Sequence, residues 1–135
     1  MASVETTKPK IRAISYLTTS QFDRLNHACL LIGEAFPMHT YLVGSVMETP
    51  NFRDVDVRTI LPDEEFDALF GGRMFFWSVF CHSVSHYLTD VSGLPIDYQV
   101  QRMTEANEKY DGMRNPIGKR SRPFAGGGDA TGFVV

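Results

Sequence analysis

Apolar residues recur along this chain at two intervals, which predict helices in some segments and strands in others. Between Ser20 and Phe36 they step by three and four residues, which predicts one amphipathic helix that ends before Pro37. The segment from Arg73 to Val91 has the same spacing and predicts a long helix. Its expected buried stripe consists of Met74, Trp77, Cys81, Val84, Leu88 and Val91.

Three segments have the composition of strands. Residues 40–43 are β-branched and aromatic and run into a Gly-Ser turn, and Pro62 ends a second strand over 54–61. Apolar and polar residues alternate over a third, 95–101. Short helices are expected over 63–70 and 103–110. This order of elements predicts an α+β fold, a small mixed sheet flanked by helices.

The length of 135 residues predicts a single domain over 13–111. A polar N-terminal tail (1–12) and a basic, Gly-rich C-terminal tail (112–135) are expected to flank it. The start of the chain lacks the pattern of a secretory signal, which predicts a cytoplasmic protein. The longest uncharged stretch, Met74 to Thr89, is too short to cross a bilayer, so no membrane partner is expected.

The net charge of -3 hides a gradient along the chain. From Arg114 onward four basic residues face one acid, Asp129, so this part carries +3 and the remainder -6. The overall charge argues against a protein that holds nucleic acid by charge alone. Weak contact with nucleic acid would therefore start in the basic C-terminal tail.

The sequence Asp-Val-Asp-Val-Arg in the second strand carries the strongest chemical signal. Residues two apart point to the same side of a strand, so Asp54, Asp56 and Arg58 share one face. Two carboxylates placed in this way can converge on divalent cations. The alternative is a solvated edge strand, whose charges prevent aggregation.

Three further features accompany this strand. Gly44 and Ser45 form a turn whose backbone amides and hydroxyl can hold a phosphate. Asp97 lies on the polar side of the third strand, either beside the other carboxylates or as an ordinary surface acid. Arg53 and Arg58 either pair with a triphosphate or neutralise the aspartates.

At these residues the chain resembles minimal members of the nucleotidyltransferase superfamily with the DNA polymerase β fold. The matching pattern is Val43-Gly44-Ser45, then Asp54-Val55-Asp56-Val57, then Ile96-Asp97. The resemblance implies a phosphate turn at Gly44 and Ser45, metal ligands at Asp54 and Asp56, and a metal ligand or an aid to the base at Asp97. The chain is also similar to short nucleotidyltransferase-like proteins of bacteriophages, which implies residence in the host cytoplasm.

The resemblance implies an enzyme that depends on Mg²⁺ or Mn²⁺. It would move a nucleoside monophosphate from a nucleoside triphosphate to an acceptor hydroxyl and release pyrophosphate. The acceptor stays open among a protein, an RNA and a small molecule. Two alternatives also stay open: a catalytically inactive module of the same fold that binds a host or viral protein, and a toxin of the nucleotidyltransferase type.

Overall fold

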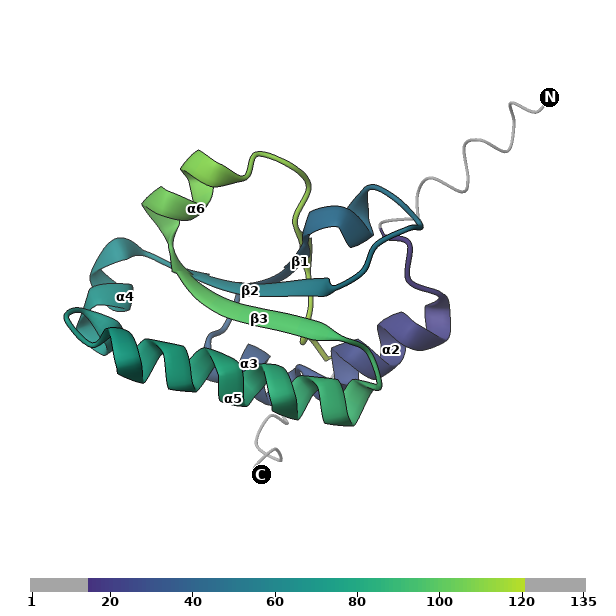
Figure 1. The fold of residues 1–135 in the computed structure, drawn as a ribbon, viewed down its shortest axis with the longest axis horizontal. Helices are drawn as coiled ribbons and strands as arrows, with labels where there is room; N and C mark the ends of the chain where they lie inside the picture. Colours follow the sequence, from purple (N-terminus) through teal and green to yellow (C-terminus); the bar gives the residue numbers. More distant parts are fainter. Residues whose placement is uncertain (1–14, 121–135) are drawn as a thin grey trace.

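A computed structural model describes residues 15–120, which form an α+β fold with a four-stranded mixed sheet (Figure 1). The predicted fold class is therefore confirmed at this level. The predicted N-terminal tail (1–12) and the part of the predicted C-terminal tail (112–135) that follows residue 120 lie outside the described residues. Among the described residues, no helix is both long enough and apolar enough to span a membrane.

Most elements lie within two residues of their predicted positions. The strands are β1 (Thr40–Val43), β2 (Val55–Leu61), β3 (Ile96–Arg102) and β4 (Asn115–Pro116). The helices are α2 (Thr19–Ala28), α3 (Leu30–Ala35), the 3-10 helix η1 (Gly44–Met47), α4 (Asp63–Phe70), α5 (Met74–Ser92) and α6 (Met103–Lys109).

The strands are arranged in the order β3-β2-β1-β4. β2 runs parallel to β3 and antiparallel to β1, while β4 is antiparallel to β1. A parallel pair needs a crossover connection, and here α4 and α5 provide it. The parallel register places Asp56 beside Asp97 and Arg58 beside Gln99.

The hydrophobic core lies between one face of the sheet and helices α2 and α5. Figure 1 shows α5 running along this face beneath β2 and β3. Alternate side chains of β2 and β3 are buried, as a strand with one covered face requires. The fully buried side chains include Leu25, Leu42, Val55, Val57, Leu88 and Tyr98.

The buried side of α5 differs in part from the predicted stripe. Cys81 and Leu88 are buried, but Met74 and Val91 at the two ends are exposed. The prediction counted only apolar positions, whereas polar Ser92 is also buried against the core. The helix therefore contacts the fold through a stripe of mixed polarity.

Polar and sulfur atoms of α5 side chains form hydrogen bonds with the backbone groups at the outer edge of β3. Four side chains, spaced by four residues along α5, form these bonds. Three of them accept hydrogen bonds from backbone amides of β3: Thr89 from Ile96, Ser85 from Tyr98, and Cys81 from Val100. The fourth, Trp77, donates to the backbone carbonyl of Val100. An edge strand otherwise presents unpaired backbone groups that invite association. The helix thus closes this edge of the sheet.

The predicted first helix is two helices. Thr18 caps the start of α2, where it exchanges hydrogen bonds with Gln21 in a capping box. The chain leaves helical geometry at Cys29 and resumes it at Leu30. Gly118 packs against this break, because a Cβ on Gly118 would lie 2.6 Å from the carbonyl oxygen of Cys29.

The predicted boundary at residue 112 does not separate the fold from a tail. β4 pairs with β1 at positions 115 and 116, and Ile117 is buried in the core. Asn26 on α2 holds the next residues, since its side-chain oxygen accepts hydrogen bonds from the amides of Gly118 and Lys119. Two residues are too few to show the alternation by which a strand is predicted.

Candidate carboxylate site on the open face of the sheet

Asp56 and Asp97 are direct neighbours on the face of the sheet that faces away from α5. They occupy paired positions of the parallel strands β2 and β3, and adjacent strands lie about 4.8 Å apart. Their apolar neighbours Val55, Val57 and Tyr98 point into the core. The side chain of Asp56 is 26% exposed and that of Asp97 is 46% exposed. Of the two positions predicted for Asp97, the structure shows the one beside Asp56.

The guanidinium of Arg58 bridges the two carboxylates. Its Nη2 lies 3.8 Å from Oδ1 of Asp56 and 3.5 Å from Oδ2 of Asp97. Its Nη1 donates hydrogen bonds to the backbone carbonyls of Asp97, at 2.6 Å, and Val57, at 3.2 Å. Only 12% of this side chain is exposed. Of the two roles predicted for Arg58, the structure shows neutralisation of the aspartates.

The pKa of Asp56 is raised above its usual value. Burial of the carboxylate is the main cause, since the charged form loses hydration. The positive charge of Arg58 lowers this pKa, while the negative charges of Asp97 and Asp54 raise it. The ion pair with Arg58 therefore only partly offsets the cost of burying the charge.

Gly44 brings the predicted phosphate turn into contact with Asp56. The glycine follows β1 with a φ of +85°, a left-handed conformation that other residues rarely adopt. A Cβ at this position would overlap with Oδ2 of Asp56. The register explains the contact, because Val43 pairs with Asp56 across β1 and β2. Both the turn and the neighbouring carboxylate therefore favour glycine at this position.

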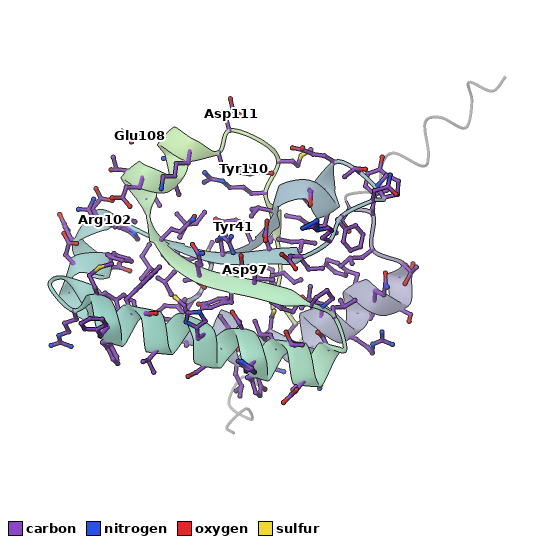
Figure 2. All side chains as sticks on the ribbon, in the orientation of Figure 1. Tyr41, Asp97, Arg102, Glu108, Tyr110 and Asp111 are labelled. Carbon is purple, nitrogen blue, oxygen red and sulfur yellow. The ribbon has the colours of Figure 1, made fainter. Side chains whose placement is uncertain are left out.

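Tyr110 lies over the same turn and was not predicted as a site residue. The amide of Gly44 donates to the hydroxyl of Tyr110 at 3.4 Å, and that hydroxyl donates to the carbonyl of Met113 at 2.6 Å. Figure 2 shows Tyr110 on the side of the sheet opposite to α5. Gly112 lets the ring fold back, since a Cβ there would lie 2.8 Å from it. In the sequence, the only hint of this folded-back ring is an aromatic residue, Tyr110, two positions before a glycine, Gly112.

Arg114 fixes the segment that carries Tyr110. Its guanidinium lies 5.9 Å from the centre of the Tyr110 ring and donates to the side chain of Asn107 and to the carbonyl of Tyr110. The prediction had counted Arg114 only as a charge of the C-terminal tail. The segment between α6 and β4 is therefore held by its own contacts beside the turn.

The remaining predicted site residues lie at the rim of this region. Asp54 precedes β2 and is exposed, and it is close enough to Asp56 to raise the pKa of that carboxyl. Ser45 and Arg53 are exposed, and neither side chain makes a hydrogen bond or an ion pair with another described residue. The structure thus gathers Gly44, Asp56, Arg58 and Asp97, and leaves the other predicted residues at the edge.

The arrangement does not fit the metal centre implied by the sequence resemblance. Among residues 15–120, no group of three or more His, Cys, Asp or Glu side chains could hold a metal ion. Arg58 fills the space between Asp56 and Asp97 in which a shared cation would lie. The two carboxylates have the right chemistry for Mg²⁺, but in this conformation their counter-ion is an arginine.

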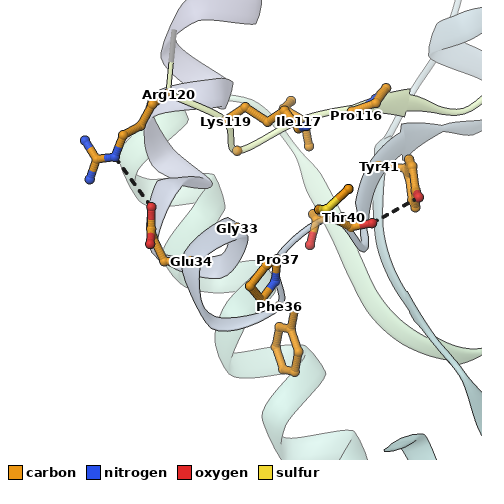
Figure 3. Close-up of a pocket in the computed structure, with 12 residues that line it drawn as sticks. Gly33, Glu34, Phe36, Pro37, Thr40, Tyr41, Pro116, Ile117, Lys119 and Arg120 are labelled. Carbon is orange, nitrogen blue, oxygen red and sulfur yellow. Dashed lines mark hydrogen bonds and ion pairs between the residues drawn. The ribbon is translucent and has the colours of Figure 1, made fainter. Parts of the chain in front are cut away.

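The described residues border cavities at both edges of the sheet. A small one of about 70 Å³ lies between β3 and α5 and is bordered by Asp97, Gln99 and His82. A larger one of about 440 Å³ lies beside β1 and β4, and Figure 3 shows Glu34 and Arg120 paired at its rim. The larger cavity contains none of the predicted site residues.

Comparison of the chain with protein-family models, curated proteins and solved structures gives no significant match.

Proposed function

We propose that this protein is a nucleotidyltransferase of the minimal DNA polymerase β type, with its site on the open face of the sheet. The observation that carries the proposal is the contact between Gly44 and Asp56. It joins the left-handed glycine turn that follows β1 to Asp56 on the neighbouring strand β2. Asp97 lies beside Asp56 in the same register, as a third acid of such a site would.

In the proposed reaction, the turn at Gly44 and Ser45 holds the phosphates of a nucleoside triphosphate. The oxygen of an acceptor hydroxyl forms a bond to the α-phosphorus, and the bond between that phosphorus and the bridging oxygen breaks to release pyrophosphate. The hydroxyl proton passes to a base. Asp97 is the better placed carboxylate for that role because it is more exposed than Asp56.

The chain also supplies cationic groups near the turn. Arg58 lies next to Asp56, and Arg53 is exposed just before β2. Guanidinium groups pair well with phosphate oxygens. We assign no step to Mg²⁺ or Mn²⁺, because Asp54, Asp56 and Asp97 could act together as its ligands only after Arg58 had left two of them.

A specific observation also favours the second candidate, a binding module of this fold without catalytic activity. Arg58 neutralises two of the three acids that catalysis would need and is itself anchored to backbone carbonyls. A site whose charges are satisfied internally is stable without any ligand. In that case the partner would be a host or viral protein, and the carboxylates would belong to an acidic surface.

Thermal unfolding in the presence of nucleotide distinguishes the two candidates. The melting temperature is measured with each nucleoside triphosphate and Mn²⁺ for the wild type, for Asp54→Asn and for the control Asp90→Asn. Asp90 is an exposed acid on α5, the helix that covers the opposite face of the sheet from the site. Stabilisation of the wild type and the control, lost in Asp54→Asn, supports the transferase. If no triphosphate stabilises the wild type, the binding module is favoured.

A further inference from the structure

The position of Arg58 leads to an inference that rests on the proposed function and deepens it. Four oxygen atoms surround its guanidinium: one carboxylate oxygen each from Asp56 and Asp97, and the backbone carbonyls of Asp97 and Val57. This set combines negative charge with carbonyl dipoles and is the kind of environment that also suits a hard cation. The chain thus places its own cation where the resemblance implies a metal.

We infer that Arg58 and a divalent cation compete for the carboxylates of Asp56 and Asp97, so that the nucleotide-free site excludes the metal. A cation shared by the two carboxylates would lie within about 4 Å of the guanidinium, where two like charges repel strongly at low exposure. The side chain of Arg58 is largely buried, so little water screens this repulsion. The metal can bind both carboxylates only when Arg58 has moved.

The incoming triphosphate provides a reason for Arg58 to move. Its phosphates would lie at the Gly44 turn, which contacts Asp56 and therefore adjoins the guanidinium. Phosphate oxygens offer an arginine paired contacts that replace those to the carboxylates. Metal and triphosphate should then bind cooperatively, because one ligand removes the group that opposes the other.

Binding of Mn²⁺ alone to the full chain tests the competition without any measurement of activity. Free Mn²⁺ is followed by electron paramagnetic resonance as it is titrated into the wild type, Arg58→Gln and Arg73→Gln. Arg73→Gln removes the same charge from an exposed position at the start of α5, outside the proposed site, and serves as the matched control. We expect Arg58→Gln to bind Mn²⁺ at least about tenfold more tightly than the wild type, and Arg73→Gln to change the affinity by less than about threefold.

Further variants make each outcome decisive. In the double variant Arg58→Gln with Asp56→Asn, the gained affinity should disappear, because one of the two carboxylates is removed. Equal affinity of Arg58→Gln and Arg73→Gln for Mn²⁺ would overturn the inference. If Arg58→Gln does not fold, the wild type still decides: tight binding of one Mn²⁺ without nucleotide, lost in Asp56→Asn, would show that Arg58 does not exclude the metal.

The outcome is distinguishable from a failure of the proposed function. Should Arg58→Gln gain Mn²⁺ affinity while no triphosphate stabilises the wild type, the competition stands and the transferase proposal fails. Should triphosphate stabilise the wild type while Arg58→Gln gains nothing, the transferase proposal stands and the competition fails.

Discussion

The indole nitrogen of Trp77 donates a 2.8 Å hydrogen bond to the backbone carbonyl of Val100. This bond joins the start of α5 to the outer edge of β3, where no further strand of residues 15–120 pairs with it. A donor-only side chain is suited to a carbonyl at such an edge. The contact therefore contributes both packing and the satisfaction of a backbone group.

Truncation of Trp77 should destabilise the protein measurably. We expect Trp77→Ala to lower the free energy of unfolding by about 2–4 kcal/mol, less than for a fully buried tryptophan because this ring is only partly buried. Trp77→Phe should cost about 1 kcal/mol, because it keeps most of the packing but leaves the Val100 carbonyl without its donor. Urea unfolding measures both, and Phe75→Ala, at an 88% exposed position nearby, should change little.

Ser85 provides a second test of how α5 closes the edge of β3. Its hydroxyl accepts from the amide of Tyr98 at 2.9 Å and donates to the carbonyl of Cys81. Ser85→Ala leaves the amide of Tyr98 unpaired, which should cost about 1–3 kcal/mol in unfolding free energy. Ser83→Ala on the exposed side of the same helix is the control and should stay within about 0.5 kcal/mol. Equal effects of the two substitutions would contradict the edge-closing role.

The helix α5 also shows how far the sequence could predict the fold. Its limits were nearly correct, because the spacing of apolar residues over nineteen positions is a strong helical signal. Its contacting side was only partly correct, because Ser85 and Thr89 face β3 for their hydrogen bonds. Hydrophobicity alone cannot identify such positions.

The candidate site was predictable to the extent that it depends on local pattern. Strand alternation placed Asp56 and Arg58 on one face, and the Gly-Ser turn was recognisable from composition. The bridging position of Arg58 depends on the parallel pairing of β2 with β3, which brings together residues 39 positions apart. The hydrogen bond between Gly44 and Tyr110 likewise joins residues that are 66 positions apart in the sequence. These contacts arise from topology, which a local pattern does not encode.

The Gly44 turn leads to a prediction that separates stability from binding. Gly44→Ala introduces a side chain at a left-handed position and should cost about 1–2 kcal/mol. The carboxylate of Asp56 can swing aside, so most of the harm should fall on the site rather than on the fold. We expect triphosphate to stabilise the wild type but not Gly44→Ala in thermal unfolding.

Gly72→Ala is the matched control for this variant. Gly72 also has a positive φ, of 72°, but a Cβ there meets nothing within 4 Å. It should lose a similar amount of stability and keep its response to triphosphate. If both variants keep that response, the Gly44 turn is not part of the nucleotide site.

Asp63 should make the stability of the fold depend on pH. Its carboxylate accepts hydrogen bonds from the hydroxyl and the amide of Thr104, and these bonds, with the charge of Arg102, lower its pKa. A lowered folded-state pKa stabilises the fold above the unfolded-state value near 3.8, and this stabilisation is lost as the pH falls through the folded-state value. Asp63→Asn should therefore be less stable than the wild type at pH 7, with a difference that shrinks in acid.

Unfolding by urea at several pH values between neutral and acid measures this difference. Glu64→Gln removes a carboxylate from the same turn of α4 and serves as the control, since the side chain of Glu64 is exposed and forms no hydrogen bond or ion pair with another described residue. It should show a smaller and flatter difference. The same pH dependence in both variants would point to the general charge at the start of α4 instead of the bond to Thr104.

Asp56→Asn should abolish nucleotide transfer without unfolding the protein. Burial raises the pKa of Asp56, so its charge costs stability above that pKa, and an uncharged side chain of the same size removes this cost. The substitution also removes the 3.8 Å ion pair between Asp56 and Arg58. Arg58 keeps its ion pair with Asp97 and its hydrogen bonds to two backbone carbonyls, so this loss should be small. At pH 7 the variant should therefore be as stable as the wild type or more stable. Any advantage should vanish as the pH falls through the raised pKa, where the wild type becomes neutral as well.

The activity assay incubates each protein with labelled nucleoside triphosphates, Mg²⁺ or Mn²⁺ and a host lysate as the source of acceptors. Equal labelling by the wild type and Asp56→Asn would refute the role of this carboxylate in transfer, whereas labelling by neither would favour the binding module.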